Sequence, residues 1–260
     1  MKKLIIVEGL PCSGKSTTAK YIAEQLGYTF VDEGTGKHPA DYEFHAFLND
    51  NAFSGFTAEE RKQISSHSER KSGGTIVKIG AFSGELFDKL LQYKVYDFLP
   101  WETERPVMLD KWHEFVRECS GGYVFNCVFL QNPMCETMMR FGFDKSSSAE
   151  YISDIYEIIM PLSPVVVYLI NNDVYNSVKK ASDERGSEWL NAVIDYHCNG
   201  EYGKSHELSG FDGYISALEE RQRRELDILS QLDIDRIIVD DPQKNWNDAY
   251  ASIISELRGN

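Results

Sequence analysis

Residues 9–16 read Gly-Leu-Pro-Cys-Ser-Gly-Lys-Ser and fit the pattern G-x-x-x-x-G-K-[ST] in full. The two glycines let a loop curl with its N–H groups pointing inward, which forms a nest for phosphate oxygens. The lysine can reach the β- and γ-phosphates of a nucleotide, and the following serine hydroxyl can ligate Mg²⁺. The pattern therefore predicts a nucleotide site with ATP and Mg²⁺ as cofactors. The expected cofactor-binding residues are Gly9, Pro11, Cys12, Ser13, Gly14, Lys15, Ser16 and Thr17, with Ser16 as the metal ligand.

The flanking residues predict the strand and helix that such a loop needs on its two sides. Residues 4–7 are an apolar run typical of a buried strand, and residues 15–26 have a helical pattern that Gly27 ends. The positive end of this helix would add to the attraction for phosphate. A plain glycine turn would account for the glycines but not for Lys15 and Ser16. We interpret Cys12 as a small loop residue rather than a nucleophile.

Two carboxylates, Asp32 and Glu33, follow the second predicted strand at residues 28–31. In a parallel sheet, the ends of neighbouring strands meet at the edge where ligands bind. A carboxylate there could orient an attacking hydroxyl and accept its proton. The competing interpretation is a pair of exposed loop carboxylates.

Further strand and helix patterns alternate along the chain and predict an α/β fold. The expected architecture is a mainly parallel sheet of about five strands, in three layers with helices on both faces. We interpret residues 1–260 as one domain, with inserted segments at about 41–120 and 173–213. The expected strands are residues 75–79, 123–130, 165–170 and 236–239, and the expected helices are residues 41–56, 84–93, 103–119, 173–181, 214–232 and 247–257. Residues 65–74 are expected to form a loop or hairpin, and the glycine-containing residues 199–213 a mobile loop.

Composition excludes several classes of protein. Hydrophobic residues make up 42% of the 260 positions and aromatic residues 12%, which excludes disorder as the main state. A formal net charge of −14 argues against a broad nucleic-acid-binding surface. No apolar run is long enough to suggest a membrane span, and five cysteines without a C-x-x-C pair suggest reduced thiols. We therefore expect a cytoplasmic protein without nucleic-acid or membrane partners.

The run from Val7-Glu8-Gly9 to Ser16-Thr17-Thr18 resembles the phosphate-binding loop of the P-loop kinases that act on nucleosides, nucleotides and other small molecules. The strand spacing is similar along most of the chain, and residues 38–42 and 202–204 resemble an uncharacterised bacterial branch of that group. The resemblance implies a P-loop NTPase fold with a helical lid. It also implies that Glu33, by its position, is the base that accepts the proton of the substrate hydroxyl, with Asp32 as the alternative.

The same resemblance implies a cationic lid after the strand at 165–170 and an acidic residue near the metal. Arg185 is the best lid candidate, ahead of Lys179 and Lys180, because its planar guanidinium suits phosphate oxygens. These kinases often carry an acidic residue in the strand that here contains Asn126, so the carboxylate that assists Mg²⁺ is left open. Arg221, Arg223 and Arg224 are expected on an exposed charged helix face.

These features favour an ATP-dependent phosphotransferase that moves the γ-phosphoryl group to a hydroxyl or phosphate of a small molecule. The acceptor could be a nucleoside, a nucleotide or a hydroxylated antibiotic-like compound. One alternative is a P-loop NTPase that acts as a switch with a protein partner, and another is a nucleotide-binding module without catalysis. The sequence leaves the acceptor, the choice of ATP or GTP, and the oligomeric state open, a homodimer included.

Overall fold

The computed structural model describes residues 2–71 and 73–259, and the chain folds into two compact units. The core unit comprises Met1–Asp32 and Val116–Asn260, and the insertion unit comprises Glu33–Phe115. Within the described residues, no helix combines the length and the apolar character needed to cross a membrane.

The core unit is built on a five-stranded sheet in the order β2-β6-β1-β7-β8, in which all neighbouring strands are parallel. The central strand β1 is buried along its whole length, as expected for a parallel strand that is covered on both faces. The sequence-based prediction of an α/β fold with a parallel five-stranded sheet is confirmed. The strands are β1 (Leu4–Gly9), β2 (Thr29–Val31), β6 (Tyr123–Asn126), β7 (Val165–Ile170) and β8 (Asp235–Asp240).

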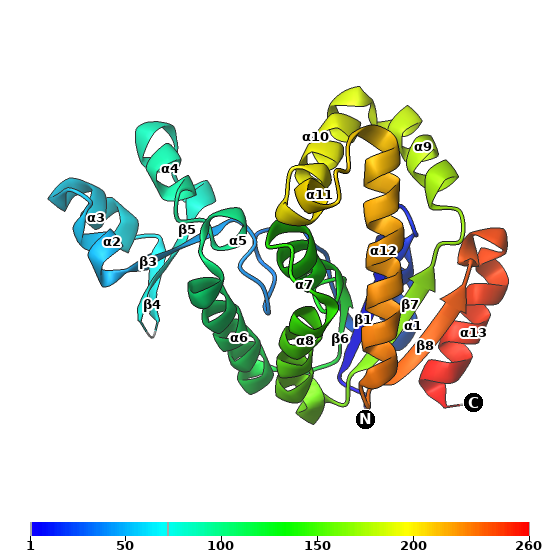
Figure 1. Ribbon diagram of the computed structural model, residues 1–260. Helices are drawn as coiled ribbons and strands as arrows, with labels where there is room; N and C mark the ends of the chain where they lie inside the picture. The colour runs from blue at the N-terminus through cyan, green and yellow to red at the C-terminus, as the bar shows by residue number, and fades with distance from the viewer. Residues whose placement is uncertain (1, 72, 260) are drawn as a thin grey trace. The chain divides into compact units, whose positions relative to one another are not determined.

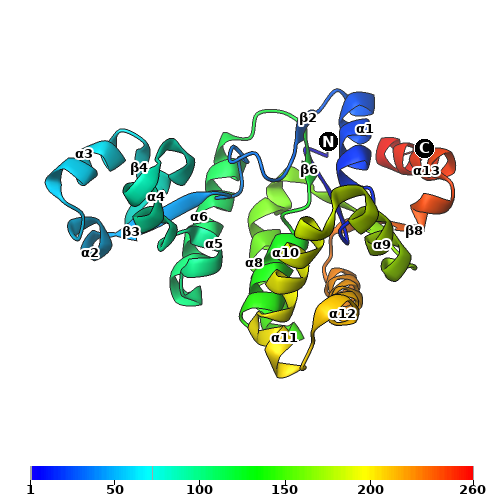
Figure 2. The same cartoon turned by 90° about the horizontal axis from the view of Figure 1, so that it is seen from above.

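Helices cover both faces of this sheet, which gives the three expected layers (Figures 1 and 2). On one face α1 (Lys15–Leu26) and α13 (Trp246–Arg258) pack together, and Ile22 and Ile253 join Val7 and Val167 in the core between helices and sheet. On the other face lie α8 (Lys145–Ile159) and α12 (Gly210–Gln231). Short connecting helices are α7 (Gln131–Met134), the π-helix η2 (Cys135–Arg140), η3 (Met160–Leu162) and η4 (Pro242–Lys244).

Three helices follow β7, in the segment where the sequence predicted a lid. They are α9 (Val174–Arg185), α10 (Ser187–Cys198) and α11 (Glu201–Ser205). Val174, Val178 and Cys198 from these helices pack with Tyr214 of α12 and with Leu10 of the phosphate loop. The segment formed by these helices therefore packs against the phosphate loop through Leu10.

The prediction of a mobile loop at residues 199–213 was wrong, because this segment contains α11 and the first turn of α12. Its glycines permit close packing rather than flexibility. A Cβ at Gly200 would lie 2.1 Å from the carbonyl oxygen of Met139, and one at Gly203 would lie 2.3 Å from that of Cys198.

The strand predicted at residues 123–130 is shorter than expected and ends at Asn126. Cys127 and Val128 have φ angles of 54° and 83°, so the backbone leaves the sheet there. The apolar residues 127–130 are still buried, which explains why the sequence resembled one continuous strand.

The insertion unit is an antiparallel sheet in the order β3-β5-β4, accompanied by helices. Its strands are β3 (His45–Asn49), β4 (Ser68–Lys71) and β5 (Gly74–Lys78). Its helices are α2 (Asp50–Ser54), α3 (Ala58–Ser65), η1 (Ile79–Ala81), α4 (Gly84–Leu91), α5 (Val95–Phe98) and α6 (Trp101–Glu118), whose residues from Val116 on belong to the core unit. Residues 41–56 were predicted as a helix, which is wrong for β3. Ala46 and Leu48 face the unit's own hydrophobic core, and their strand pairs with β5.

Candidate active site

The loop between β1 and α1 has the backbone that the glycine pattern predicted. Gly9 and Gly14 have φ angles of 142° and 90°, and a Cβ at either position would collide with its surroundings. At Gly9 it would lie 2.6 Å from the carbonyl oxygen of Leu169, and at Gly14 it would lie 2.4 Å from the indole of Trp246. Both glycines are therefore required sterically, and the loop is held between β7 and α13.

Lys15 is the buried cation of this loop. Its side chain is 6% exposed, and Nζ donates a hydrogen bond of 2.9 Å to the carbonyl oxygen of Leu10. In the described part of the chain Lys15 forms no salt bridge, and no side chain caps the N-terminus of α1 or places an acid in its first turn. A positive charge and uncapped helix N–H groups therefore face the same loop, which is an arrangement that suits an anion.

Asn126, at the end of β6, joins the loop to Asp32 beyond the end of β2. Its Nδ2 donates to Ser16 Oγ at 2.9 Å and to Asp32 Oδ1 at 2.7 Å. The strand order explains why Asn126 contacts both Asp32 and Ser16. Strand β6 lies between β2 and β1, and Asn126 is in register with Val7 of β1. Asn126 is fully buried, and its Oδ1 has no hydrogen-bond partner within the described residues.

The donor atoms at this position fit a magnesium ion. Ser16 and Asp32 supply hard oxygen ligands, and Mg²⁺ is commonly held by one or two protein oxygens together with substrate phosphates and water. Among the described residues there is no group of three or more His, Cys, Asp or Glu side chains that could hold a metal. The described residues therefore do not form a metal site built from three or more His, Cys, Asp or Glu ligands.

Glu33, the preferred base in the sequence-based prediction, is exposed and begins the insertion unit. The turn that follows is fixed within that unit by Glu43, whose carboxylate accepts hydrogen bonds from the N–H groups of Gly34 at 2.6 Å and Gly36 at 2.8 Å. Asp32, the alternative base, belongs to the core unit. It accepts a hydrogen bond from Asn126, which also donates to Ser16. The assignment of the base to Glu33 stays a prediction.

Arg185 ends α9, and its charge acts on the phosphate loop. Burial raises the pKa of the Cys12 thiol, and the positive charges of Arg185 and Lys15 partly offset this rise. The Arg185 guanidinium also lies 4.9 Å from the centre of the Trp189 ring. Lys179 and Lys180, the weaker lid candidates, are exposed on the same helix.

Two contacts from the segment after β8 were not predicted. Gln243 Nε2 donates to the carbonyl oxygen of Cys12 at 3.3 Å, and Trp246 covers Gly14. No spacing in the sequence marks these residues, because the contact depends on how α13 packs beside α1. Together they place the segment at residues 241–246 against the phosphate loop.

A buried polar network behind the loop was also missed. Glu8, fully buried in β1, accepts hydrogen bonds from the N–H groups of Phe129 and Leu130 at 2.9 Å and of Gln131 at 3.2 Å. Burial raises the pKa of the Glu8 carboxyl to about 7, and the Glu225 carboxylate acts in the same direction. The only sequence signal was an acidic residue at the end of an apolar strand.

The network continues into α12. Glu225 forms an ion pair of 3.1 Å with Arg221, and its other oxygen accepts a 2.5 Å hydrogen bond from the Tyr168 hydroxyl. Arg221 was predicted on an exposed face, and this was wrong, since its side chain is 1% exposed. Arg223 and Arg224 do pair with Glu220 nearer the surface.

Comparison with known proteins gives likenesses of fold. No protein-family model and no curated protein matches the chain. Among solved structures, the YorR protein from Bacillus subtilis, solved in complex with phosphorylated GDP, is 14% identical over 98% of this chain and 95% of its own, with a TM-score of 0.45. Deoxyadenosine kinase from M. mycoides, solved with products dCMP and dCDP, is 16% identical to this chain. The match covers 99% of this chain and 100% of the kinase, with a TM-score of 0.47. A gluconokinase from Sinorhizobium meliloti is 14% identical to this chain. The match covers 92% of this chain and 82% of the gluconokinase, with a TM-score of 0.37. Identities and scores this low do not by themselves define an activity.

Proposed function

We propose that the core unit binds Mg-ATP and transfers its γ-phosphoryl group to a hydroxyl or phosphate of a small molecule. The observation that carries the proposal is that Asn126 links Asp32 to Ser16, the residue that follows the buried Lys15 of the phosphate loop. The Lys15 ammonium donates to the backbone carbonyl of Leu10 and has no salt bridge within the described residues, and the Asn126 amide donates to the oxygens of Ser16 and Asp32. This set of groups matches the charges of a nucleotide triphosphate and its cation.

Each residue has a separate task in this proposal. Lys15, which in the present structure donates to the Leu10 carbonyl, would bind the β- and γ-phosphate oxygens. Ser16 and Asp32 would hold the magnesium ion, whose chemistry would be to neutralise charge on the transferring group. Asn126 is a positioning residue, because its amide donates to both oxygens.

The remaining groups prepare the acceptor and close the site. If Asp32 serves the metal, Glu33 is the carboxylate left to orient the acceptor hydroxyl and take its proton late in the transfer. Arg185 supplies positive charge from the lid segment, near Cys12. Closure of α9–α11 would exclude water and favour transfer over hydrolysis.

The acceptor classes that we consider are nucleosides, nucleotides and hydroxylated antibiotic-like compounds. The net charge of −14 supports a protein that acts on small molecules rather than nucleic acid. We place the enzyme in the cytoplasm, without a membrane partner, and leave a homodimer open.

The test is ADP release from Mg-ATP across these acceptor classes, with Lys15→Ala as the blank. We expect release only with one acceptor class, and none in the variant, which removes a phosphate contact but no core packing. Asp32→Asn should raise the Mg²⁺ concentration needed for half-maximal ADP release while the protein stays folded. Turnover with water alone, or only with a protein partner, would instead support the NTPase switch. Unchanged transfer by Lys15→Ala would refute the assignment of the loop.

A further inference from the structure

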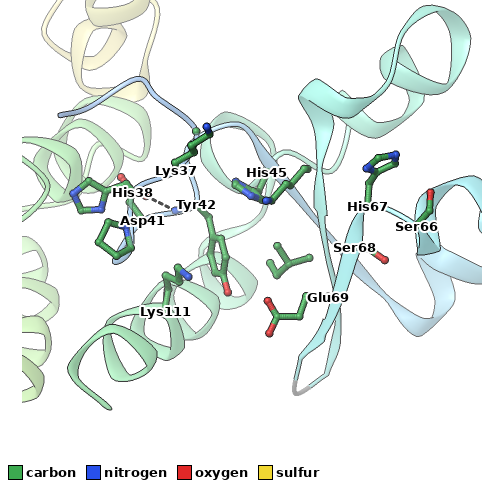
Figure 3. A pocket seen from close by; sticks show the side chains of 14 residues that line it. Lys37, His38, Asp41, Tyr42, His45, Ser66, His67, Ser68, Glu69 and Lys111 are labelled. Atoms are coloured by element: carbon green, nitrogen blue, oxygen red, sulfur yellow. Dashed lines mark hydrogen bonds between the residues drawn. The ribbon is translucent and has the colours of Figure 1, made fainter. Parts of the chain in front are cut away.

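The insertion unit contains a cavity of about 530 Å³ that the proposed function does not use. It lies between the segment before β3, the edge formed by β4 and β5, and α6. In Figure 3, Tyr42, His45 and Lys111 project into a common space, facing the strand that carries Ser68 and Glu69. A cavity of this volume is within the range of small-molecule sites, about 300–1,000 Å³.

Three lysines from three separate segments line this cavity. Lys37 precedes β3, Lys78 is the last residue of β5, and Lys111 is on α6. Lys37 and Lys78 are exposed and form no salt bridge with any of the residues described. Lys111 is only partly compensated, because the Glu114 carboxylate lies 3.4 Å from it but 2.9 Å from Lys71.

The two acids of the cavity wall are engaged by other groups. Glu69 forms a 2.6 Å ion pair with Lys71. Asp41 Oδ1 accepts hydrogen bonds of 2.6 Å from the Tyr42 N–H and from the Tyr96 hydroxyl. The lining therefore carries three lysines against two acids, a formal charge of +1, although the whole chain carries −14.

His38 and His45 add neutral hydrogen-bonding groups rather than further charge. His38 Nδ1 accepts from the Ala40 N–H at 3.2 Å, and burial, assisted by Lys111, lowers the pKa of His38 to about 3. His45 Nδ1 lies 3.2 Å from the Glu43 carbonyl oxygen and donates to it, and burial lowers the His45 pKa as well. The positive charge near pH 7 thus comes from the lysines.

The centre of the wall is a buried phenol beside apolar groups. Tyr42 is 4% exposed, and its hydroxyl has no hydrogen-bond partner among residues 2–71 and 73–259. Its ring lies 5.6 Å from that of His45 and 5.1 Å from Lys111 Nζ. Ile76, 5% exposed, lines the same cavity. A ligand with an organic body and an anionic end matches this combination.

We propose that this cavity binds a small phosphate monoester, with the phosphate at Lys37, Lys78 and Lys111 and the organic part against Tyr42, His45 and Ile76. Three ammonium groups match a dianionic phosphate better than a single carboxylate. The site lies wholly within the insertion unit and does not depend on the phosphate loop. It is therefore a second ligand site of the chain.

The test uses the full chain and ribose 5-phosphate as the probe, with ribose and gluconate as matched compounds. Binding is followed by NMR of the histidine ring protons, because His38, His45 and His67 line the cavity whereas His197 and His206 belong to the core unit. We expect ribose 5-phosphate to shift the cavity signals, and ribose and gluconate to leave them unchanged at the same concentration.

Two variants locate the phosphate. Lys37→Ala/Lys78→Ala should weaken binding at least about tenfold, which corresponds to about 1.4 kcal/mol. Lys62→Ala, which removes an exposed lysine of α3 outside the cavity, should leave the affinity unchanged. Equal affinity of these two variants would overturn the proposal, and so would cavity signals that do not move or that move as much with gluconate.

Lys15→Ala separates this site from the phosphate loop. We expect the variant to lose ADP release and to keep the ribose 5-phosphate shifts of the cavity histidines. Loss of those shifts would assign the probe to the phosphate loop and overturn the second site. A failure of the proposed kinase activity would leave the binding result untouched.

Discussion

Replacing Asn126 with aspartate tests whether Ser16 and Asp32 form a cation site. In the present chain the amide nitrogen donates to both oxygens, at 2.9 and 2.7 Å. Aspartate has nearly the same shape but cannot donate when ionised. Asn126→Asp therefore converts two favourable contacts into a cluster of oxygens with two negative charges.

The magnitude follows from the distance between the two carboxylates. After slight relaxation to about 4 Å, two unit charges repel by about 4 kcal/mol at an effective dielectric constant near 20. This equals about three pKa units, so one proton is retained near neutral pH. Solvent around the half-buried Asp32 reduces the effect, and we expect a loss of about 2–4 kcal/mol in the free energy of unfolding at pH 8.

The assay is denaturant unfolding at several pH values, with and without millimolar Mg²⁺. Because the shared proton raises a carboxyl pKa in the folded state, the penalty should be absent near pH 4 and grow as pH rises toward 7. Mg²⁺ should raise the free energy of unfolding of Asn126→Asp more than that of the unmodified protein. Asn126→Leu is the control, since it loses the same hydrogen bonds without adding charge. If both variants show the same pH profile and neither responds to Mg²⁺, the inference of a cation site is refuted.

Three further substitutions test the surroundings of the loop through the free energy of unfolding. Gly14→Ala should cost about 2–5 kcal/mol, because its φ is 90° and its Cβ would lie 2.4 Å from Trp246. Glu8→Gln should remove one contribution to the pH dependence of the free energy of unfolding. Since the folded-state pKa is raised from 4.5 to about 7, Glu8 lowers stability by up to about 3 kcal/mol as pH rises between these values, and the variant should lack this slope. Arg221→Met should cost about 3–5 kcal/mol by leaving the Glu225 carboxylate buried without its partner.

Each of these substitutions has a matched comparison. Gly34→Ala, with a φ of 73° and no atom within 4 Å of the added Cβ, should cost only the backbone strain of about 1–2 kcal/mol. Arg221→Met combined with Glu225→Leu should recover part of the loss. If Gly14→Ala matches Gly34→Ala, the contact with Trp246 is not rigid. Parallel pH slopes for the unmodified protein and Glu8→Gln would mean that Glu8 titrates normally.

Local sequence signals determined the elements that the sequence predicted well. The helix at residues 15–26 coincides with α1, which lies between two glycines of positive φ, Gly14 and Gly27. The strand at residues 165–170 coincides with β7, an apolar run that Pro164 precedes. In both cases the boundary residue is next to the element in the sequence.

Predictions failed where a distant partner decides the outcome. Residues 45–49 became a strand because they pair with β5, about thirty residues later. Arg221 and Glu225 are one helical turn apart, so the helix itself brings them together, but only packing against Tyr168 and Cys135 from distant segments buries the pair. Likewise, the sequence showed Asp32 and Asn126 as unrelated positions, since their contact depends on the strand order β2-β6-β1.

The strand order also gives a physical reason for an amide at position 126. Asn126 is fully buried, and its amide nitrogen is a hydrogen-bond donor to both a carboxylate oxygen and a hydroxyl oxygen. An amide supplies that donor and keeps Ser16 and Asp32 in place before a cation arrives, whereas a carboxylate would need a proton or a metal ion to remain there. The departure from the acidic residue expected at this position therefore need not remove the metal site. Under the proposed function, Asp32 is the carboxylate that would hold the ion, which makes Asp32→Asn the substitution that should separate magnesium binding from nucleotide binding.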